Sequence, residues 1–261
     1  MKWLSRLFLI IDLKAVLITV LAVLSTHLCI EFELTSEFPF TLVATAVVFP
    51  IVFSISAADK RRETALERYA DMKAHGRAVF LAARDWLEKS DVEVQNRAKQ
   101  QLENVLGACR RMFTSPLEAM RENEVRVYAA FSDLSHYVKT DLRGRGLASG
   151  EVSRCNQYVS KMLLAFESTK HIYQYRTPRS LQAFSDFFVK FLPILYGPYF
   201  AQVAGEGSGG LEYVTPVLFT LVLVSLDNIQ AHLENPFDLV GEDDVVINVE
   251  KFLTSLDVRT S

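Results

Sequence analysis

The side chains that could do chemistry are scattered along this chain. The five histidines have no metal-ligand spacing, and none pairs with a serine or a cysteine in a readable catalytic motif. Cys29, Cys109 and Cys155 are odd in number and far apart, which predicts reduced, buried thiols rather than disulfides or a zinc site. The glycine-rich run at 205–210 would need a preceding strand and a following helix to cradle a phosphate, and a tight turn explains it better. We therefore predict that the protein is not an enzyme and has no catalytic residue.

Four apolar stretches lie toward the two ends of the chain, and any functional side chains must be positioned by the helices that these stretches form. They lie at 13–30, 38–58, 187–204 and 214–226, with a charged region of about 120 residues between the two pairs. A helix over 38–58, which holds no charged residue, is about 31 Å long, the thickness of a bilayer core. The stretch at 187–204 is interrupted by Lys190, and 214–226 is short enough to be a buried core helix. The pattern predicts two transmembrane hairpins.

Charge asymmetry predicts how the hairpins are oriented. The loops inside the two hairpins, 31–37 and 205–212, hold acids and no base, whereas basic residues lie outside them. These flanking bases are Lys2, Arg6, Lys60, Arg61, Arg62, Arg68, Arg176 and Arg179. By the positive-inside rule, both hairpin tips lie outside and both termini are cytosolic. Asp12 and Lys14 interrupt the first apolar run and no small-residue cleavage site follows, so we interpret it as a retained span rather than a signal peptide.

The region between the hairpins is predicted to be an all-α bundle. Half of all residues are hydrophobic but 23% are charged, too many for membrane helices alone, and a net charge of −3 gives no reason to expect nucleic acid. Two capping boxes, starting at Ser90 and Ser115, predict helices near 91–112 and 116–139, and apolar periodicity predicts a third over about 149–175. Residues 59–88 contain one glycine and no proline, so the second span should continue as one long helix into the cytosol.

These patterns divide the chain into four predicted regions. Residues 1–58 form the first transmembrane hairpin and 59–180 the cytosolic helical region. Residues 181–232 form the second hairpin, and 233–261 form a C-terminal cytosolic segment. No linker separates the soluble and membrane parts, so we expect them to fold as one cooperative unit.

The segment after the last apolar stretch resembles the signature of the bestrophin family. The matching residues are Glu234, Asn235, Pro236 and Phe237, followed by the acidic pair Asp243 and Asp244. Residues 49–61 resemble the second bestrophin span and its basic exit, and residues 176–178 with 191–193 resemble the approach to the third span. With four spans at the same relative places, the resemblance covers most of the chain.

The resemblance implies a homopentameric anion channel whose second span lines a narrow neck. The positions that align with the family's apolar neck are Thr45, Phe49 and Phe53, which lie four apart and so share a helix face. Five copies of each phenylalanine would form apolar rings that gate by drying the pore, with ring edges offered to chloride or bicarbonate. The alternative is that Phe49 and Phe53 pack against neighbouring helices. Thr45 and Pro50 depart from the family pattern and predict a wider, bent or wetter neck.

Charged residues near the spans have both structural and functional interpretations. Lys60, Arg61 and Arg62 lie about two turns beyond Phe53, where they anchor the topology and would concentrate anions at the cytosolic mouth of the pore. Asp186 and Lys190, four residues apart, are predicted to form an ion pair that makes a lysine tolerable in the membrane, with a pore-facing Lys190 as the alternative.

The acidic run after the signature invites a calcium hypothesis, because animal bestrophins bind calcium through such a run. Here Glu242, Asp243 and Asp244 supply fewer than the six to eight oxygens that calcium wants, and four residues separate them from Phe237. We therefore predict no cofactor, with a helix-capping or subunit-contact role for the run and calcium as the alternative.

Other functions remain open at this point. A homo-oligomeric scaffold that kept the fold and lost conduction, or a sensor reporting through residues 249–261, would have the same sequence pattern. No acid-poor leader rich in Arg and Ser precedes the first span, which favours a bacterial inner membrane over a thylakoid membrane.

Overall fold

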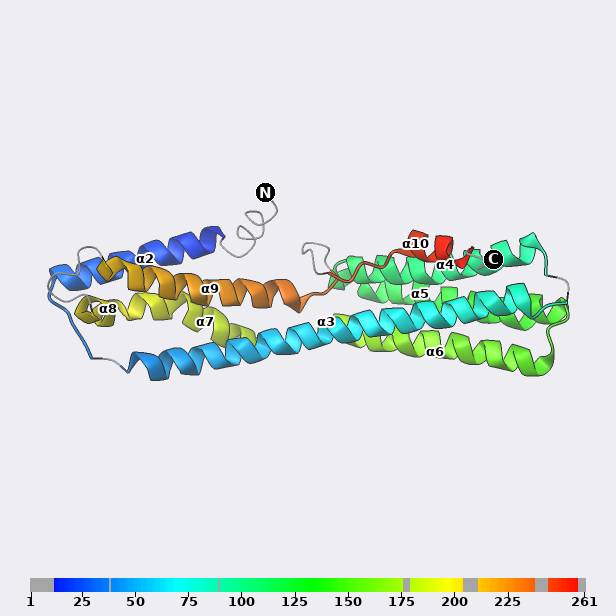
Figure 1. The fold of residues 1–261 in the computed structure, drawn as a ribbon, viewed down its shortest axis with the longest axis horizontal. Helices are drawn as coiled ribbons and strands as arrows, with labels where there is room; N and C mark the ends of the chain where they lie inside the picture. Colours follow the sequence, from blue (N-terminus) through cyan, green and yellow to red (C-terminus); the bar gives the residue numbers. More distant parts are fainter. Residues whose placement is uncertain are drawn as a thin grey trace. The chain divides into compact units, whose positions relative to one another are not determined.

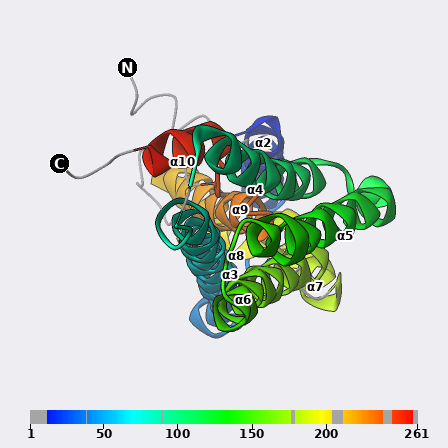
Figure 2. The same ribbon diagram turned by 90° about the vertical axis from the view of Figure 1, so that its right-hand side faces the viewer.

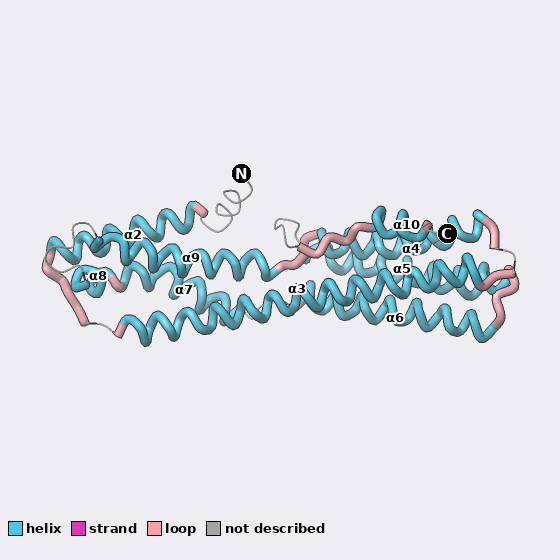
Figure 3. The backbone as a smooth tube through the Cα atoms, in the orientation of Figure 1, coloured by secondary structure: helices cyan, strands magenta, loops and turns pink. Residues whose placement is uncertain are grey.

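The computed structural model describes residues 12–37, 39–88, 90–175, 179–203, 211–237 and 244–257. Within these ranges the chain is helical and contains no strand, which confirms the predicted all-α class (Figures 1 and 3). The long helices are α2 (Leu13–Glu31), α3 (Phe40–Asp85), α4 (Val92–Thr114), α5 (Met120–His136), α6 (Ser149–Gln174), α7 (Arg179–Leu195) and α9 (Val214–Glu234). The shorter ones are η1 (Leu117–Ala119), η2 (Tyr137–Leu142), α8 (Gly197–Val203), η3 (Leu211–Tyr213) and α10 (Val249–Leu256).

The chain forms two compact units that share helix α3. Unit 1 comprises Met1–Lys60 and Thr177–Glu234, and unit 2 comprises Arg61–Arg176 and Asn235–Ser261. Helix α3 is 46 residues long and passes from one unit into the other without a break. Its length agrees with the continuous helix expected from the absence of a terminator after residue 58.

In unit 1, helix α2 packs against α7, α8 and α9. Buried aliphatic side chains from α3, α7 and α9 form its core, including Val47, Ile51, Val189, Leu192 and Leu223. Three of its helices, α2, α3 and α9, are long and apolar enough to cross a membrane. Helix α9 begins at the predicted residue but continues to Glu234, which gives the fourth apolar stretch the length it lacked in the sequence.

The third predicted span, 187–204, is split into two helices. Helix α7 ends at Leu195 after Pro193, and α8 begins at Gly197. A Cβ at Gly197 would lie 2.4 Å from Ser25 Oγ and 3.1 Å from the Ser25 carbonyl carbon, so glycine permits a close approach to α2. Ser25 Oγ in turn donates a hydrogen bond to the Ile194 carbonyl at 2.8 Å. The break therefore docks the α7–α8 junction onto α2.

Unit 2 is a helical bundle with a dense apolar core. Helices α4, α5 and α6 pack on one another and α10 packs on α4, as the end-on view shows (Figure 2). Fully buried side chains from α3, α4, α5 and α6, among them Phe80, Leu102, Leu134 and Phe166, fill the centre. Cys109 and Cys155 are buried here and Cys29 in unit 1, all three as free thiols, as predicted.

The helix starts in unit 2 differ from both predicted capping boxes. Helix α4 is capped by Asp91, whose Oδ1 accepts a hydrogen bond from the Val94 amide at 2.8 Å, while Ser90 Oγ donates to the Ala83 carbonyl. Ser115 Oγ donates to the Arg111 carbonyl at 2.5 Å, so it closes α4 instead of capping the next helix. Both serines lie within reach of carbonyls at the end of the preceding helix, and that local bond competes with capping.

The predicted helix over 116–139 is composite. It begins as the 3₁₀ turn η1, continues as α5 and ends in the π-helical turn η2. Tyr137, the first residue of η2, is buried and donates its hydroxyl to the Val94 carbonyl at 3.0 Å. The wider turn thus coincides with a side-chain bond that ties α5 to the start of α4.

Candidate functional site

The predicted neck residues lie on an exposed face of α3. Thr45 is exposed, and 56% of Phe49 and 67% of Phe53 are accessible. The opposite face is buried, with Val47, Ile51, Ser54 and Ala58 at 3% exposure or less. The helical repeat therefore separates a face that builds the core of unit 1 from a face that the chain itself leaves uncovered.

Phe49 and Phe53 form a stacked pair on that face. Their ring centroids are 6.1 Å apart with an interplanar angle of 25°. Both rings are more than half exposed, so they do not pack into the core of their own unit. Lipid, another subunit and a pore axis remain as environments for the pair.

Pro50 does not end the helix. Because proline has no amide hydrogen, the carbonyl four residues earlier, at Ala46, loses its usual partner. Ser54 Oγ donates a hydrogen bond to the Pro50 carbonyl at 2.9 Å. The predicted neck segment is thus a continuous helix in which the Ala46 carbonyl, one turn before Pro50, lacks its usual intrahelical donor.

The bases at the predicted mouth follow on the same helix. Lys60 lies seven residues after Phe53, about 10 Å along the axis, and is exposed, while Arg61 and Arg62 are partly exposed. The seven-residue spacing returns Lys60 to nearly the same face as Phe53. A cation thus follows the aromatic pair along one side of α3.

A network of charged groups joins three helices of unit 1. Lys190 Nζ lies 3.0 Å from Asp186 Oδ1, which confirms the predicted pair on α7. Lys14 on α2 is 3.7 Å from Asp186 and 2.7 Å from Asp227 Oδ2 on α9, and Ser185 Oγ donates to Asp227 Oδ1 at 3.0 Å. Sequence analysis missed the role of Asp227. The signal was present, because a lysine at the end of one apolar helix needs an acid at the end of another.

The bestrophin-like signature connects α9 to unit 2. Glu234 ends α9 and accepts hydrogen bonds from Gln182 Nε2 at 2.5 Å. Phe237 is 1% exposed and stacks on Phe113 with centroids 4.9 Å apart and an interplanar angle of 20°. The Pro236 carbonyl accepts from the Val245 amide at 2.7 Å. Phe237 is therefore an anchor in the core of unit 2, a role that the sequence motif alone did not reveal.

The acidic run is only partly within the described residues. Glu242 and Asp243 lie outside them, as do the glycine-rich run and the flanking bases Lys2, Arg6 and Arg176, while Asp244 is described and partly exposed. Among the described residues, no three His, Cys, Asp or Glu side chains are grouped to hold a metal ion. The calcium hypothesis stays untested.

The thiols of unit 2 are poor nucleophiles. Burial raises the pKa of Cys155 to about 11 and moves the pKa of Cys109 further upward. Both thiols are therefore protonated near neutral pH, and a thiol is much less reactive than a thiolate.

Several solved structures have an arrangement of helices similar to that of this chain. A bacterial bestrophin homologue from Klebsiella pneumoniae superposes with a TM-score of 0.74 at 13% identity, covering 93% of this chain and 97% of that one. The fold is bestrophin-like. An alanine variant of the Klebsiella homologue gives a TM-score of 0.73 at 16% identity, covering 93% and 98% of the two chains. A further structure, described as a membrane protein, gives 0.75 at 16%, covering 94% and 99%.

The bestrophin-like fold extends over nearly the whole chain. No protein-family model matches the sequence, and no curated protein matches it. The likeness to bestrophin structures is thus visible in the arrangement of the helices. The short sequence motifs had already suggested it. The apolar helices and this fold together point to a membrane protein.

Proposed function

We propose that this protein is a bestrophin-like anion channel, assembled as a homopentamer, in which α3 of each subunit lines a hydrophobic neck. Chloride, and bicarbonate as a second candidate, would pass between rings formed by Thr45, Phe49 and Phe53. The proposal assigns transport rather than catalysis.

The observation that carries this proposal is the exposed aromatic pair on α3. Leaving Phe49 and Phe53 uncovered costs nothing in lipid, at a subunit contact or beside a dewetting pore, but is unfavourable in water. The proposal places the exposed face of α3 toward a central symmetry axis. Ring edges carry the positive part of the aromatic quadrupole and would attract a chloride ion that has shed part of its water.

The bases that follow would act on anions before they enter. Lys60 lies on nearly the same face as Phe53, with Arg61 and Arg62 next to it. Five copies of this cluster would raise the local anion concentration at the mouth. The same bases would hold the mouth on the cytosolic side, so both termini and unit 2 would be cytosolic.

The proposed membrane topology has four crossings. Helices α2, α3 and α9 each have the length of a span, and α7 with α8 together would form the remaining crossing, broken near Tyr196. We assign the protein to a bacterial inner membrane, with a thylakoid membrane as the alternative. The proposal does not require calcium. If calcium does bind, the acidic residues at 242–244 are the candidate ligands.

A non-conducting homo-oligomeric scaffold or sensor is the competing proposal. Thr45 and Pro50 favour it, because a polar residue and a freed carbonyl disturb an apolar neck. In a scaffold, the exposed face of α3 would contact lipid or a neighbouring subunit instead of an axis.

The test is anion flux from liposomes that contain the purified protein at matched incorporation. Phe49→Ala and Phe53→Ala should change the chloride flux or the chloride-to-bicarbonate selectivity, because each shortens five inward side chains at once. A symmetric oligomer that passes no anion in the native form or in either variant would exclude the channel and favour the scaffold.

Helix α7 supplies a matched control. Phe187 and Phe191 also lie four residues apart in unit 1, with 52% and 49% exposure and ring centroids 5.0 Å apart. Phe187→Ala and Phe191→Ala remove the same number of atoms from another exposed apolar face, so flux and selectivity should stay at native values. Equal effects from both pairs would mean that exposure reports lipid or subunit contacts rather than the permeation path.

A further inference from the structure

Unit 2 contains a pocket lined by bases between α3 and the C-terminal segment. It has a volume of about 470 Å³. Tyr69, Lys73 and Arg77, spaced four apart along one face of α3, form one wall. Asn248, Lys251 and Ser255, from α10 and its cap, form the other. The pocket belongs to neither the proposed neck nor the mouth.

The two walls are held together by the core beneath them. Phe252 of α10 is 4% exposed, and a Cβ added at Gly76 of α3 would lie 3.6 Å from its ring and 3.2 Å from Leu102. The tight approach at Gly76 is thus to Leu102 of α4, and Phe252 lies beside it at an ordinary packing distance. Asn248 caps α10, its Oδ1 accepting from the Lys251 amide at 2.8 Å, and its carbonyl accepts from the Tyr69 hydroxyl at 3.4 Å. These contacts connect the two walls of the pocket.

Charges are segregated across α10. Glu250 and Asp257 face α4, where Glu250 binds Arg110 at 2.8 and 2.9 Å and Asp257 pairs with Lys99. The bases of the opposite side, Lys73 and Lys251, form no salt bridge with any carboxylate among the described residues. The pairing on one side of α10 thus leaves positive charge concentrated on the other.

Arg77 and Tyr69 shape the pocket without neutralising it. The Arg77 guanidinium donates to the Ser255 carbonyl at 3.1 Å and to Ser255 Oγ at 2.7 Å, neither of which carries a charge. Lys73 Nζ lies 4.5 Å from the centroid of the Tyr69 ring. Burial raises the pKa of Tyr69, so its hydroxyl stays neutral near pH 7 and adds no negative charge.

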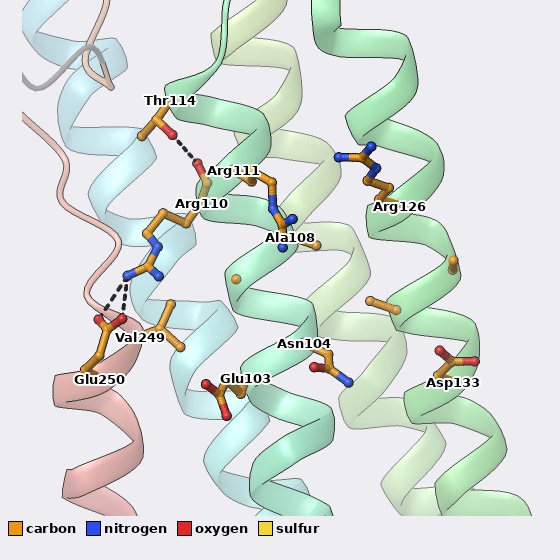
Figure 4. A pocket seen from close by; sticks show the side chains of 13 residues that line it. Glu103, Asn104, Ala108, Arg110, Arg111, Thr114, Arg126, Asp133, Val249 and Glu250 are labelled. Atoms are coloured by element: carbon orange, nitrogen blue, oxygen red, sulfur yellow. Dashed lines mark hydrogen bonds and ion pairs between the residues drawn. The ribbon is translucent and has the colours of Figure 1, made fainter.

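A larger groove in the same unit is lined by both positive and negative side chains. It lies between α4, α5 and α10, with a volume of about 730 Å³ (Figure 4). Arg110, Arg111 and Arg126 line it together with Glu103, Asp133 and Glu250, and the Arg110–Glu250 bonds cross one side of it. Its charges compensate one another, whereas the described residues that line the pocket beside Lys73 include three bases and no acid.

We propose that the pocket formed by Lys73, Arg77 and Lys251 binds a small soluble anion of the phosphate or pyrophosphate class. Three cations at one site match an anion with several charged oxygens, and Ser255 and Asn248 add neutral hydrogen-bonding groups. The volume is far larger than a halide needs and falls within the range of small-molecule sites. None of its described lining residues belongs to the proposed neck or mouth, so its occupancy can be tested by binding alone.

The place of the pocket along α3 favours a soluble anion over a lipid headgroup. Tyr69 follows the last residue of the apolar stretch, Ala58, by eleven positions, about 16 Å of helix, and Arg77 by about 28 Å. A headgroup at the membrane surface would have to reach well beyond the apolar part of the helix.

The experiment titrates sodium pyrophosphate into the full-length protein in neutral detergent by isothermal calorimetry at constant ionic strength. Lys73→Gln combined with Lys251→Gln should weaken binding by about tenfold or more, since each lysine supplies a charge-assisted contact. Lys139→Gln combined with Lys161→Gln makes the same change in net charge at exposed sites outside the pocket and should leave affinity within about twofold. Lys251→Gln alone, at an exposed side chain, serves if the double variant unfolds.

Three results would overturn the proposal. One is the absence of binding to the native protein at millimolar pyrophosphate. Another is equal weakening by the two double variants, which would mean non-specific attraction. The last is stabilisation by vesicles of phosphatidic acid, dependent on Lys73 and Lys251, without any binding of soluble pyrophosphate, which would assign the pocket to a headgroup. Because the readout is binding, failure of the flux test would leave this result intact.

Discussion

Unit 1 and unit 2 are both built from helices around an apolar core, but they differ in the side chains that they leave exposed. On α2 the apolar side chains Leu13, Leu17, Val20, Leu24 and Leu28 point outward, with exposures from 47% to 84%. In unit 2 most of the large apolar side chains are inside, and charged side chains pair on the surface.

The helices of unit 1 are joined by polar contacts as well as by packing. Lys14 pairs with Asp227, Ser25 bonds the Ile194 carbonyl, and Gln182 bonds Glu234. In apolar surroundings, burying apolar surface contributes little to the association of helices. Close packing at small residues and polar contacts between helices then stabilise the association. The two units are therefore suited to different solvents. We expect different kinds of substitution to destabilise each of them.

The largest effect is expected where unit 2 depends on its apolar core. Phe237→Ala removes a ring stacked on Phe113, and a cavity of this kind costs about 3–5 kcal/mol of unfolding free energy. Thermal and chemical unfolding of the purified protein would measure the loss. Tyr175→Ala, at an aromatic side chain that is 59% exposed, should change stability little. Equal losses in the two variants would contradict the assignment of Phe237 as a core anchor.

In unit 1 the comparable weak point is electrostatic. Asp227→Leu removes the partner that lies 2.7 Å from Lys14 and leaves only Asp186, at 3.7 Å. The change should cost about 2–3 kcal/mol, measured as a loss of thermal stability in detergent. Adding Lys14→Met should restore most of it, because an apolar pair of similar size needs no solvation. Failure of the second substitution to rescue the first would show that the network does more than compensate charge.

Two glycines sharpen the comparison of packing. Gly197→Ala places a Cβ against the backbone of Ser25 in unit 1 and should destabilise by about 1–3 kcal/mol. Gly107→Ala, in mid-helix with open space around the new Cβ, should stabilise unit 2 by about 0.5–1 kcal/mol through helix propensity. Shifts of melting temperature in opposite directions are the expected result, and shifts of the same sign would argue against close packing at Gly197.

The smallest effect is expected from a surface network in unit 2. Lys170 pairs with Glu124 at 2.8 Å and Glu167 at 2.6 Å, and its hydrogen bond lowers the pKa of Glu124. A lowered carboxyl pKa stabilises the fold above the unfolded value of 4.5, and that contribution disappears as pH falls through the folded value. Melting curves from pH 6 to pH 3 should fall less steeply for Lys170→Met, by less than about 1 kcal/mol. An unchanged slope would exclude this contribution.

Features encoded over short distances were predictable. The helical class, the continuity of α3, the buried free thiols and the Asp186–Lys190 pair all follow from periodicity, composition or a spacing of four residues. The positions of the helix caps were not, because Ser90 and Asp91 are neighbours of equal capping ability. Which of them caps α4 depends on Ala83, at the end of the preceding helix, being close enough to accept from Ser90.

The third span shows the same limit. An apolar run at 187–204 predicts one helix, but Pro193 and the close approach of Gly197 to Ser25 divide it. Proline in the interior of a helix weakens it, yet Pro50 in α3 leaves its helix unbroken. Local sequence signals a place where a helix can break, and the packing around it decides whether it does.

The sequence by itself determined where the apolar helices lie and which residues carry charge, because those properties belong to contiguous residues. Only the tertiary structure decided that Lys14 meets Asp227, 213 positions away, that Phe237 anchors the signature in the core of unit 2, and that Lys73, Arg77 and Lys251 share a pocket. Such partners depend on which helix faces meet in the folded chain, and neither periodicity nor spacing encodes that.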